Sequence, residues 1–127
     1  MRSIVLAALT VISACSRQDR RLQKHWEKLE SLGASAALIG SAWLSGSTSG
    51  TYTLSALEQT FALTEKERST LASAPEALTD PRGAELSQSA ERLSRLLAAM
   101  RQDVRTSNAS SVRRHLSDIA GLTAERR

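Results

Sequence analysis

Few side chains in this sequence have the types and the spacing that enzyme chemistry or metal binding requires. The chain contains one cysteine, Cys15, and two histidines, His25 and His115. A single thiol cannot form an intrachain disulfide or a cysteine-rich zinc site. The histidines lie far apart, and neither has a second ligand three or four residues further along. We therefore expect no metal site, with each histidine on a helix surface or half-buried.

Other catalytic patterns are also weak. The stretch from Gly46 to Gly50 has the glycine spacing of a nucleophile elbow, but Thr48 occupies the nucleophile position and no strand precedes it. We therefore interpret this stretch as a loop and not as a catalytic turn. Glu65 and Glu67 are two apart, so they do not face each other on a helix, and we assign them to a helix cap. No glycine-rich phosphate-binding loop is present. The sequence predicts a non-enzymatic protein with no cofactor and no evident small-molecule substrate.

Residues 1–15 form a pattern with a chemical consequence. A cationic start, Met1-Arg2-Ser3, precedes an uncharged, largely apolar run over residues 4–12. A bilayer-spanning helix needs roughly 20 apolar residues, so this run instead has the length typical of an export signal. It ends in Ile12-Ser13-Ala14-Cys15, an aliphatic residue and two small residues before the only cysteine. These four residues resemble the lipobox of bacterial lipoprotein precursors.

The resemblance implies that residues 1–14 are a signal peptide, cleaved between Ala14 and Cys15. It also implies diacylglycerol on the Cys15 sulfur and acylation of the freed amine. Each buried methylene contributes about 0.8 kcal/mol, so two or three acyl chains anchor a protein stably. Ser16 after the cysteine implies, by the sorting rule of that family, the periplasmic side of the outer membrane. The alternative is a cytosolic helical module with a signal-like start and an ordinary buried Cys15.

The remainder of the chain, residues 15–127, has the composition of one folded domain. Of the 127 residues in the whole chain, 41% are hydrophobic and 24% are charged, which excludes a disordered or collagen-like chain. Apolar residues recur at helical intervals without strand-like alternation, which predicts an all-α fold. We expect helices at about 17–44, 55–73, 81–106 and 110–124. The first and third are long, and we predict that they pair antiparallel in a three- or four-helix bundle.

Apolar seams spaced by four and three residues support these helices. Small residues in the middle of the first seam predict that another helix approaches closely there. The first seam comprises Leu22, Trp26, Leu29, Gly33, Ala36, Gly40 and Trp43, and His25, Leu32 and Ile39 widen it. The third helix contributes Leu86, Ala90, Leu93, Leu97, Met100 and Val104, the second Leu57 and Phe61, and the fourth Val112, Leu116, Ile119 and Leu122.

Local signals predict where the helices begin and end. Capping boxes at 55–58 and 64–67 predict a start at Ser55 and a bend near Thr64. Pro75 ends the second helix, because proline disfavours helix at the residue before it. Asp80 and Pro81 open the third helix. Asn108 or Ser110 caps the fourth.

Charge is unevenly distributed along the chain. Basic residues follow Cys15 and would lie close to a lipid surface if Cys15 is acylated, each adding about 1 kcal/mol of attraction to anionic headgroups. These residues are Arg17, Arg20, Arg21, Lys24 and Lys28. A second basic group, Arg92, Arg95, Arg101 and Arg105, falls on different sides of its helix, with an ordinary exposed pair between Glu91 and Arg95. No aromatic residue interleaves with this second group, so we expect no nucleic-acid binding.

Residues 31–57 carry no charge, and residues 32–44 are mostly apolar. Small residues four apart suit tight packing inside a bundle, which Ser35 and Ser41 favour over membrane insertion. The leading prediction is a lipid-anchored envelope protein that acts as a scaffold or as a module binding a protein partner. Two alternatives stay open: a membrane-active lipoprotein that inserts or oligomerises through 32–44, and the cytosolic module described above.

Overall fold

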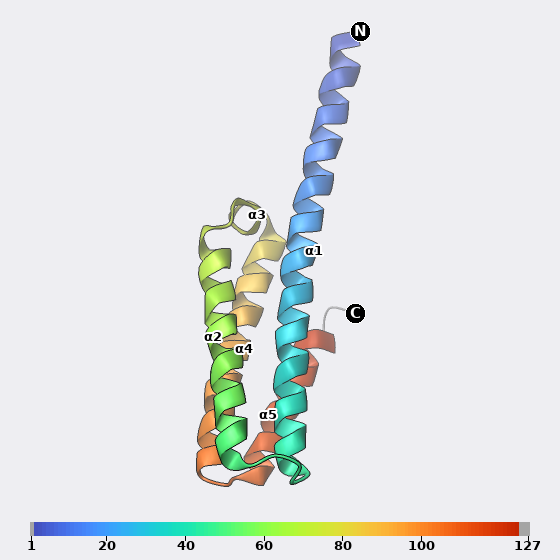
Figure 1. Cartoon of the computed structure of the whole chain (residues 1–127). Helices are drawn as coiled ribbons and strands as arrows, with labels where there is room; N and C mark the ends of the chain where they lie inside the picture. Colours follow the sequence, from blue (N-terminus) through green and yellow to red (C-terminus); the bar gives the residue numbers. More distant parts are fainter. Residues whose placement is uncertain (1, 125–127) are drawn as a thin grey trace.

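The computed structural model describes the backbone of residues 2–124 and the side chains of residues 17–124. This part of the chain is all-helical, as predicted, with five helices (Figure 1). They are α1 (Arg2–Leu44), α2 (Gly50–Ser73), α3 (Pro75–Leu78), α4 (Pro81–Arg105) and α5 (Ala109–Ala124). The four longer helices pack as a bundle, and α1 extends well beyond one end of it (Figure 1).

Successive long helices run in opposite directions because short connections join them (Figure 1). The most extensive contact is between α2 and α4, and α1 contacts both α2 and α5. Two reversals separate α1 from α4, so these helices run parallel and meet across the bundle. The expectation that the two long helices form an antiparallel pair is therefore wrong.

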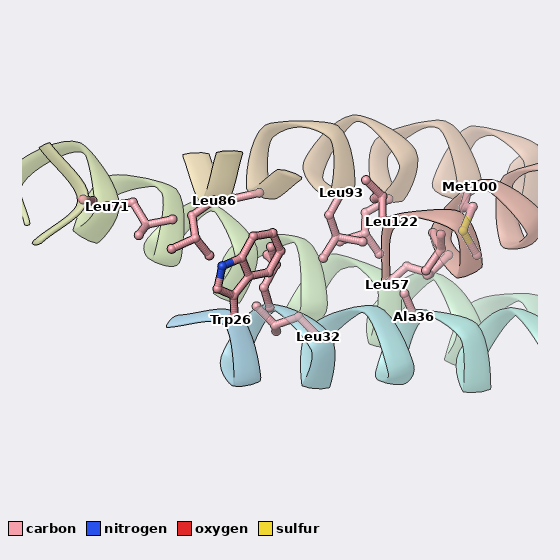
Figure 2. Close-up of a cluster of buried hydrophobic side chains, with 14 of the residues drawn as sticks. Trp26, Leu32, Ala36, Leu57, Leu71, Leu86, Leu93, Met100 and Leu122 are labelled. Atoms are coloured by element: carbon pink, nitrogen blue, oxygen red, sulfur yellow. The ribbon is translucent and has the colours of Figure 1, made fainter. Parts of the chain in front are cut away.

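Both predicted seams of the long helices lie in the core (Figure 2). Every α4 seam residue is buried, and the α1 seam is buried from Leu22 to Gly40, with Trp43 half-buried. The predicted close approach occurs at Gly40. An added Cβ there would lie 2.8 Å from the Met100 side chain of α4 and 2.9 Å from that of Leu116 of α5. The absence of a side chain at Gly40 thus allows α1 to pack closely against α4 and α5.

The start of α2 differs from its prediction. The helix begins at Gly50 rather than at residue 55, because the Ser49 side chain caps it by accepting a hydrogen bond from the Tyr52 amide. Thr64 caps nothing. It is buried within an uninterrupted helix, and its hydroxyl donates to the Thr60 carbonyl at 2.8 Å. The predicted bend near Thr64 is therefore wrong.

The remaining boundaries follow their local signals. Ala74 is extended, which ends α2 before Pro75, and the Asp80 side chain caps α4 through the Arg82 amide. Asn108, rather than Ser110, caps α5 by accepting from the Ser111 amide at 3.2 Å. The short helix α3 was not predicted. It packs against the first turn of α4.

Residues 32–44 pack into the bundle along one face. Leu32 and Ala36 are buried, and Gly40 contacts α4 and α5, whereas Leu38 points outward and is 73% exposed. None of the helices within residues 2–124 combines the length and the hydrophobicity needed to span a bilayer.

Candidate functional site

The predicted cleavage and lipidation residues, Ala14 and Cys15, lie outside the residues whose side chains the structure describes. Their backbone belongs to α1, whose first part projects from the bundle (Figure 1). Among the described side chains, the first hydrogen bonds and ion pairs from α1 to another helix follow within four residues. Gln18 donates to Asp80 at 3.3 Å, and Asp19 pairs with Arg82 at 2.6 Å. Cys15 therefore stands within about one helical turn of the bundle's end.

The basic residues after Cys15 share one side of α1. Arg17, Arg21, Lys24 and Lys28 follow at intervals of four, three and four, so they lie on one face, with Arg20 beside them. All five are exposed. This basic face borders α2 and α3, since the Lys28 Nζ lies 3.3 Å from the Glu67 carboxylate of α2 and Arg21 acts electrostatically on Glu76 of α3. The predicted surface residues therefore stand together at the end of the bundle from which α1 projects.

An ionic cluster joins α1, α2 and α3 beside this basic face. The His25 Nδ1 lies 2.8 Å from Glu67 Oε1, and its Nε2 lies 2.9 Å from Glu76 Oε1. Glu67 is only 1% exposed, and its second oxygen meets Lys28. A protonated imidazole can donate to both carboxylates, whereas a neutral one can donate to only one. The cluster therefore favours the charged form of His25.

The pKa values of the cluster agree with this geometry. Burial lowers the pKa of His25, but hydrogen bonds with Glu76 and Glu67 outweigh burial and raise it above its ordinary value of 6.5. The hydrogen bond from His25 lowers the pKa of Glu76 below 4.5, and Arg21 adds to this electrostatically. The ion pair is thus present at mildly acidic pH, above the lowered pKa of Glu76 and below the raised pKa of His25.

The cluster binds helices together, and its shape is unsuited to a metal ion. Metal ligands must converge on one point, but Glu67 and Glu76 contact the two ring nitrogens of His25 and occupy the positions a metal would need. Among the described side chains, no group of three or more His, Cys, Asp or Glu residues is positioned to hold a metal ion.

A second ionic group lies nearer the end of the bundle. Arg82 on α4 contacts Asp19 of α1 at 2.6 Å and its own helix cap, Asp80, at 2.7 Å. Its side chain lowers the pKa of Asp80 to about 2. Together with Gln18, these residues hold the first described side chains of α1 against the beginning of α4.

Several of these roles differ from the sequence predictions. Glu67 is buried opposite His25, and Glu65 accepts from Arg68 and Ser94, so neither belongs to a helix cap. His115, half-buried as predicted, lies 2.6 Å from Asp103. The Glu91–Arg95 pair on the α4 surface is confirmed.

The sequence did hold one signal for the missed cluster. The buried face of α2 follows helical spacing, but most of its members are polar: Thr53, Leu57, Thr60, Thr64, Glu67 and Leu71. A search restricted to apolar residues finds only part of this face. Threonines can occupy this buried face because their hydroxyls donate hydrogen bonds to backbone carbonyls one turn earlier, as Thr53 does to the Ser49 carbonyl.

Comparison with protein families, with curated proteins and with solved structures yields no match to this chain. Functional inference therefore depends on the residues and their placement.

Proposed function

We propose that this protein is a bacterial envelope lipoprotein, cleaved before Cys15 and anchored by acyl chains on that residue. The helical domain would then serve, without catalysis, as a scaffold or as a module that binds a protein partner in the periplasm. The observation that carries the proposal is the lipobox-like run Ile12-Ser13-Ala14-Cys15, which ends shortly before Gln18, the first described side chain that bonds to another helix.

The placement of Cys15 supports an anchoring role. Gln18 follows it by three residues, so only about 5 Å of helix axis separates the anchor from the bundle. Acyl chains there would hold the α3 end of the bundle at the bilayer and direct the loop between α1 and α2 away from it (Figure 1). The basic face of α1 would lie on the membrane side, where anionic headgroups attract it.

The use of the polar groups supports a binding or scaffolding role over an enzymatic one. Half-buried His25 and buried Glu67 are occupied in joining α1 to α2 and α3. His115 likewise contacts Asp103, at the junction of α4 and α5. These polar side chains therefore hold helices together, and their contacts are within the protein.

Mass spectrometry of the protein from its natural host tests the anchor. We expect a chain that begins at Cys15 and carries the added mass of diacylglycerol and an acyl group. The Cys15→Ala variant should retain residues 1–14 and lose the lipid. A chain that keeps Met1 and an unmodified Cys15 would favour the cytosolic module instead.

Sorting provides a second, independent readout. By the rule of the family that the first residues resemble, Ser16 sends the protein to the outer membrane. We expect Ser16→Asp to move the acylated protein to the inner-membrane fraction, while Ser16→Ala leaves it in the outer membrane. Equal distribution of the three proteins would contradict the outer-membrane assignment.

A further inference from the structure

The end of the bundle beside Cys15 contains an open pocket between α1 and α3. Its volume is about 270 Å³, and it is lined by Arg17, Gln18, Arg21, Pro75, Glu76 and Thr79. Arg17 and Arg21 are one helical turn apart, so both guanidinium groups belong to the same rim. Guanidinium groups bind phosphate oxygens through paired hydrogen bonds.

The acidic groups at this end already have partners inside the fold. Glu76 bonds to His25, and Arg82 pairs with both Asp19 and Asp80. In contrast, Arg17, Arg20 and Lys24 form no ion pair with any side chain that the structure describes. Most of the positive charge around the pocket is therefore available to an external anion, and Arg21, which also acts electrostatically on Glu76, would be shared between the two.

An exposed apolar side chain accompanies this charge. Leu78, the last residue of α3, is 68% exposed and directly precedes the pocket residue Thr79. Figure 1 places α3 at the end of the bundle from which α1 projects. An exposed apolar side chain at the same end of the domain as a group of basic residues is the arrangement found on surfaces that lie in the headgroup region of a membrane. A soluble anion would make no use of it.

We propose that this end of the bundle is a docking surface for anionic phospholipid. Arg17 and Arg21 hold the headgroup phosphate in the pocket, and Leu78 enters the boundary between headgroups and acyl chains. The orientation rests on the proposed anchor at Cys15. The recognition chemistry does not, and it can be measured on a protein that cannot be acylated.

The test uses the full-length Cys15→Ser protein and vesicles of phosphatidylcholine with or without phosphatidylglycerol. We expect tighter binding to the anionic vesicles, and a loss of about 30-fold in Arg17→Gln/Arg21→Gln, because each arginine contributes about 1 kcal/mol. The Arg105→Gln/Arg113→Gln pair, exposed on α4 and α5, is the control with the same loss of charge and should change binding much less. The apolar start of the chain is common to all variants.

Leucine substitutions test the apolar half of the surface. We expect Leu78→Ser to weaken binding to anionic vesicles severalfold, and Leu63→Ser, at a position 52% exposed on α2, to leave it unchanged. Equal losses in the two arginine pairs would overturn the proposal, since they would indicate attraction by overall charge. Release of the protein from vesicles by millimolar inorganic phosphate would also overturn it in favour of a free-anion site. An unmodified Cys15 would refute the anchor but not these results.

Discussion

His25 is in contact with a carboxylate on each side, so its charge state determines whether the contact is attractive. Protonated, the ring donates to both Glu67 and Glu76. Neutral, it leaves a nitrogen lone pair against one carboxylate oxygen. Lys28 from α1 faces the same Glu67, and Arg21 acts on Glu76. These are the charged groups that α1, α2 and α3 bring to the cluster, and they make the attachment of α1 dependent on pH.

We expect the free energy of unfolding to fall as pH rises above 6.5 and through the raised pKa of His25. The pKa of folded His25 is above 6.5, so its contribution is complete below pH 6.5 and is lost as pH rises through the folded value. At the acid side, the pKa of folded Glu76 is below 4.5, so its contribution is present above that pH and is lost as pH falls through the folded value. Urea unfolding between about pH 4 and pH 9 measures both limbs.

The His25→Leu variant isolates the histidine. It leaves the Glu67 carboxylate buried with only Lys28, and removal of one partner from a buried ion pair costs about 3 kcal/mol. We expect that loss near pH 6 and a flatter profile above it. The decrease in the free energy of unfolding at higher pH, which His25→Leu should remove, should remain in His115→Leu, because His115 pairs with Asp103 and not with this cluster. A neutral-pH slope unchanged by His25→Leu would refute the assignment.

At the scale of elements, the joint between α3 and α4 depends on one glycine. A Cβ on Gly83 would lie 1.9 Å from the Ala77 carbonyl oxygen, which is backbone and cannot move aside. We expect Gly83→Ala to destabilise the fold by about 2–3 kcal/mol. Gly121 of α5 has nothing within 4 Å of the same added atom, so Gly121→Ala should stabilise by about 0.5–1 kcal/mol.

Urea midpoints of the two alanine variants provide the measurement, and the predicted shifts have opposite signs. The substitution is chemically identical in both, so helix propensity alone would raise both midpoints. A midpoint for Gly83→Ala at or above that of the parent protein would show that α3 does not press on α4.

Helix boundaries were predictable where the signal acts locally. Asp80 with Pro81, and Asn108, cap their helices through bonds to the next two or three residues. The boxes at Ser55 and Thr64 failed because the same pattern also fits the interior of a helix, where the Thr64 hydroxyl bonds to the carbonyl of Thr60. At four residues, α3 is too short to show a periodic pattern.

The ionic cluster could not be assembled from spacing. His25 is 42 residues from Glu67 and 51 from Glu76, so only the packing of α1 against α2 and α3 brings them together. The basic residues after Cys15 are simpler, because they lie on one helix at helical spacing, on the side that the buried α1 seam leaves outward. Local periodicity is therefore sufficient to define the exposed basic face, whereas the contacts of His25 require the packing of three helices.

At the scale of the whole molecule, the direction of each helix determines which parts lie near the proposed anchor. The expectation of an antiparallel long pair failed because α2 lies between α1 and α4 in the chain and each short connection reverses direction. The resulting order puts α3 at the end of the bundle from which α1 projects and the last part of α1 at the opposite end (Figure 1). Cys15 and Trp43, both on α1, are about 40 Å apart along its axis.

This separation distinguishes an upright anchored bundle from a protein that inserts residues 32–44 into the bilayer. We expect Trp43 fluorescence of the acylated protein to be insensitive to lipids with brominated acyl chains, measured in a Trp26→Phe variant where Trp43 is the only tryptophan. A Leu78→Trp protein that lacks both native tryptophans is the positive control, because position 78 would lie at the bilayer. Insertion requires Leu32 and Ala36 to leave the core and predicts strong quenching of Trp43. That quenching, in a protein whose helical content is unchanged, would replace the anchored scaffold with the membrane-active function.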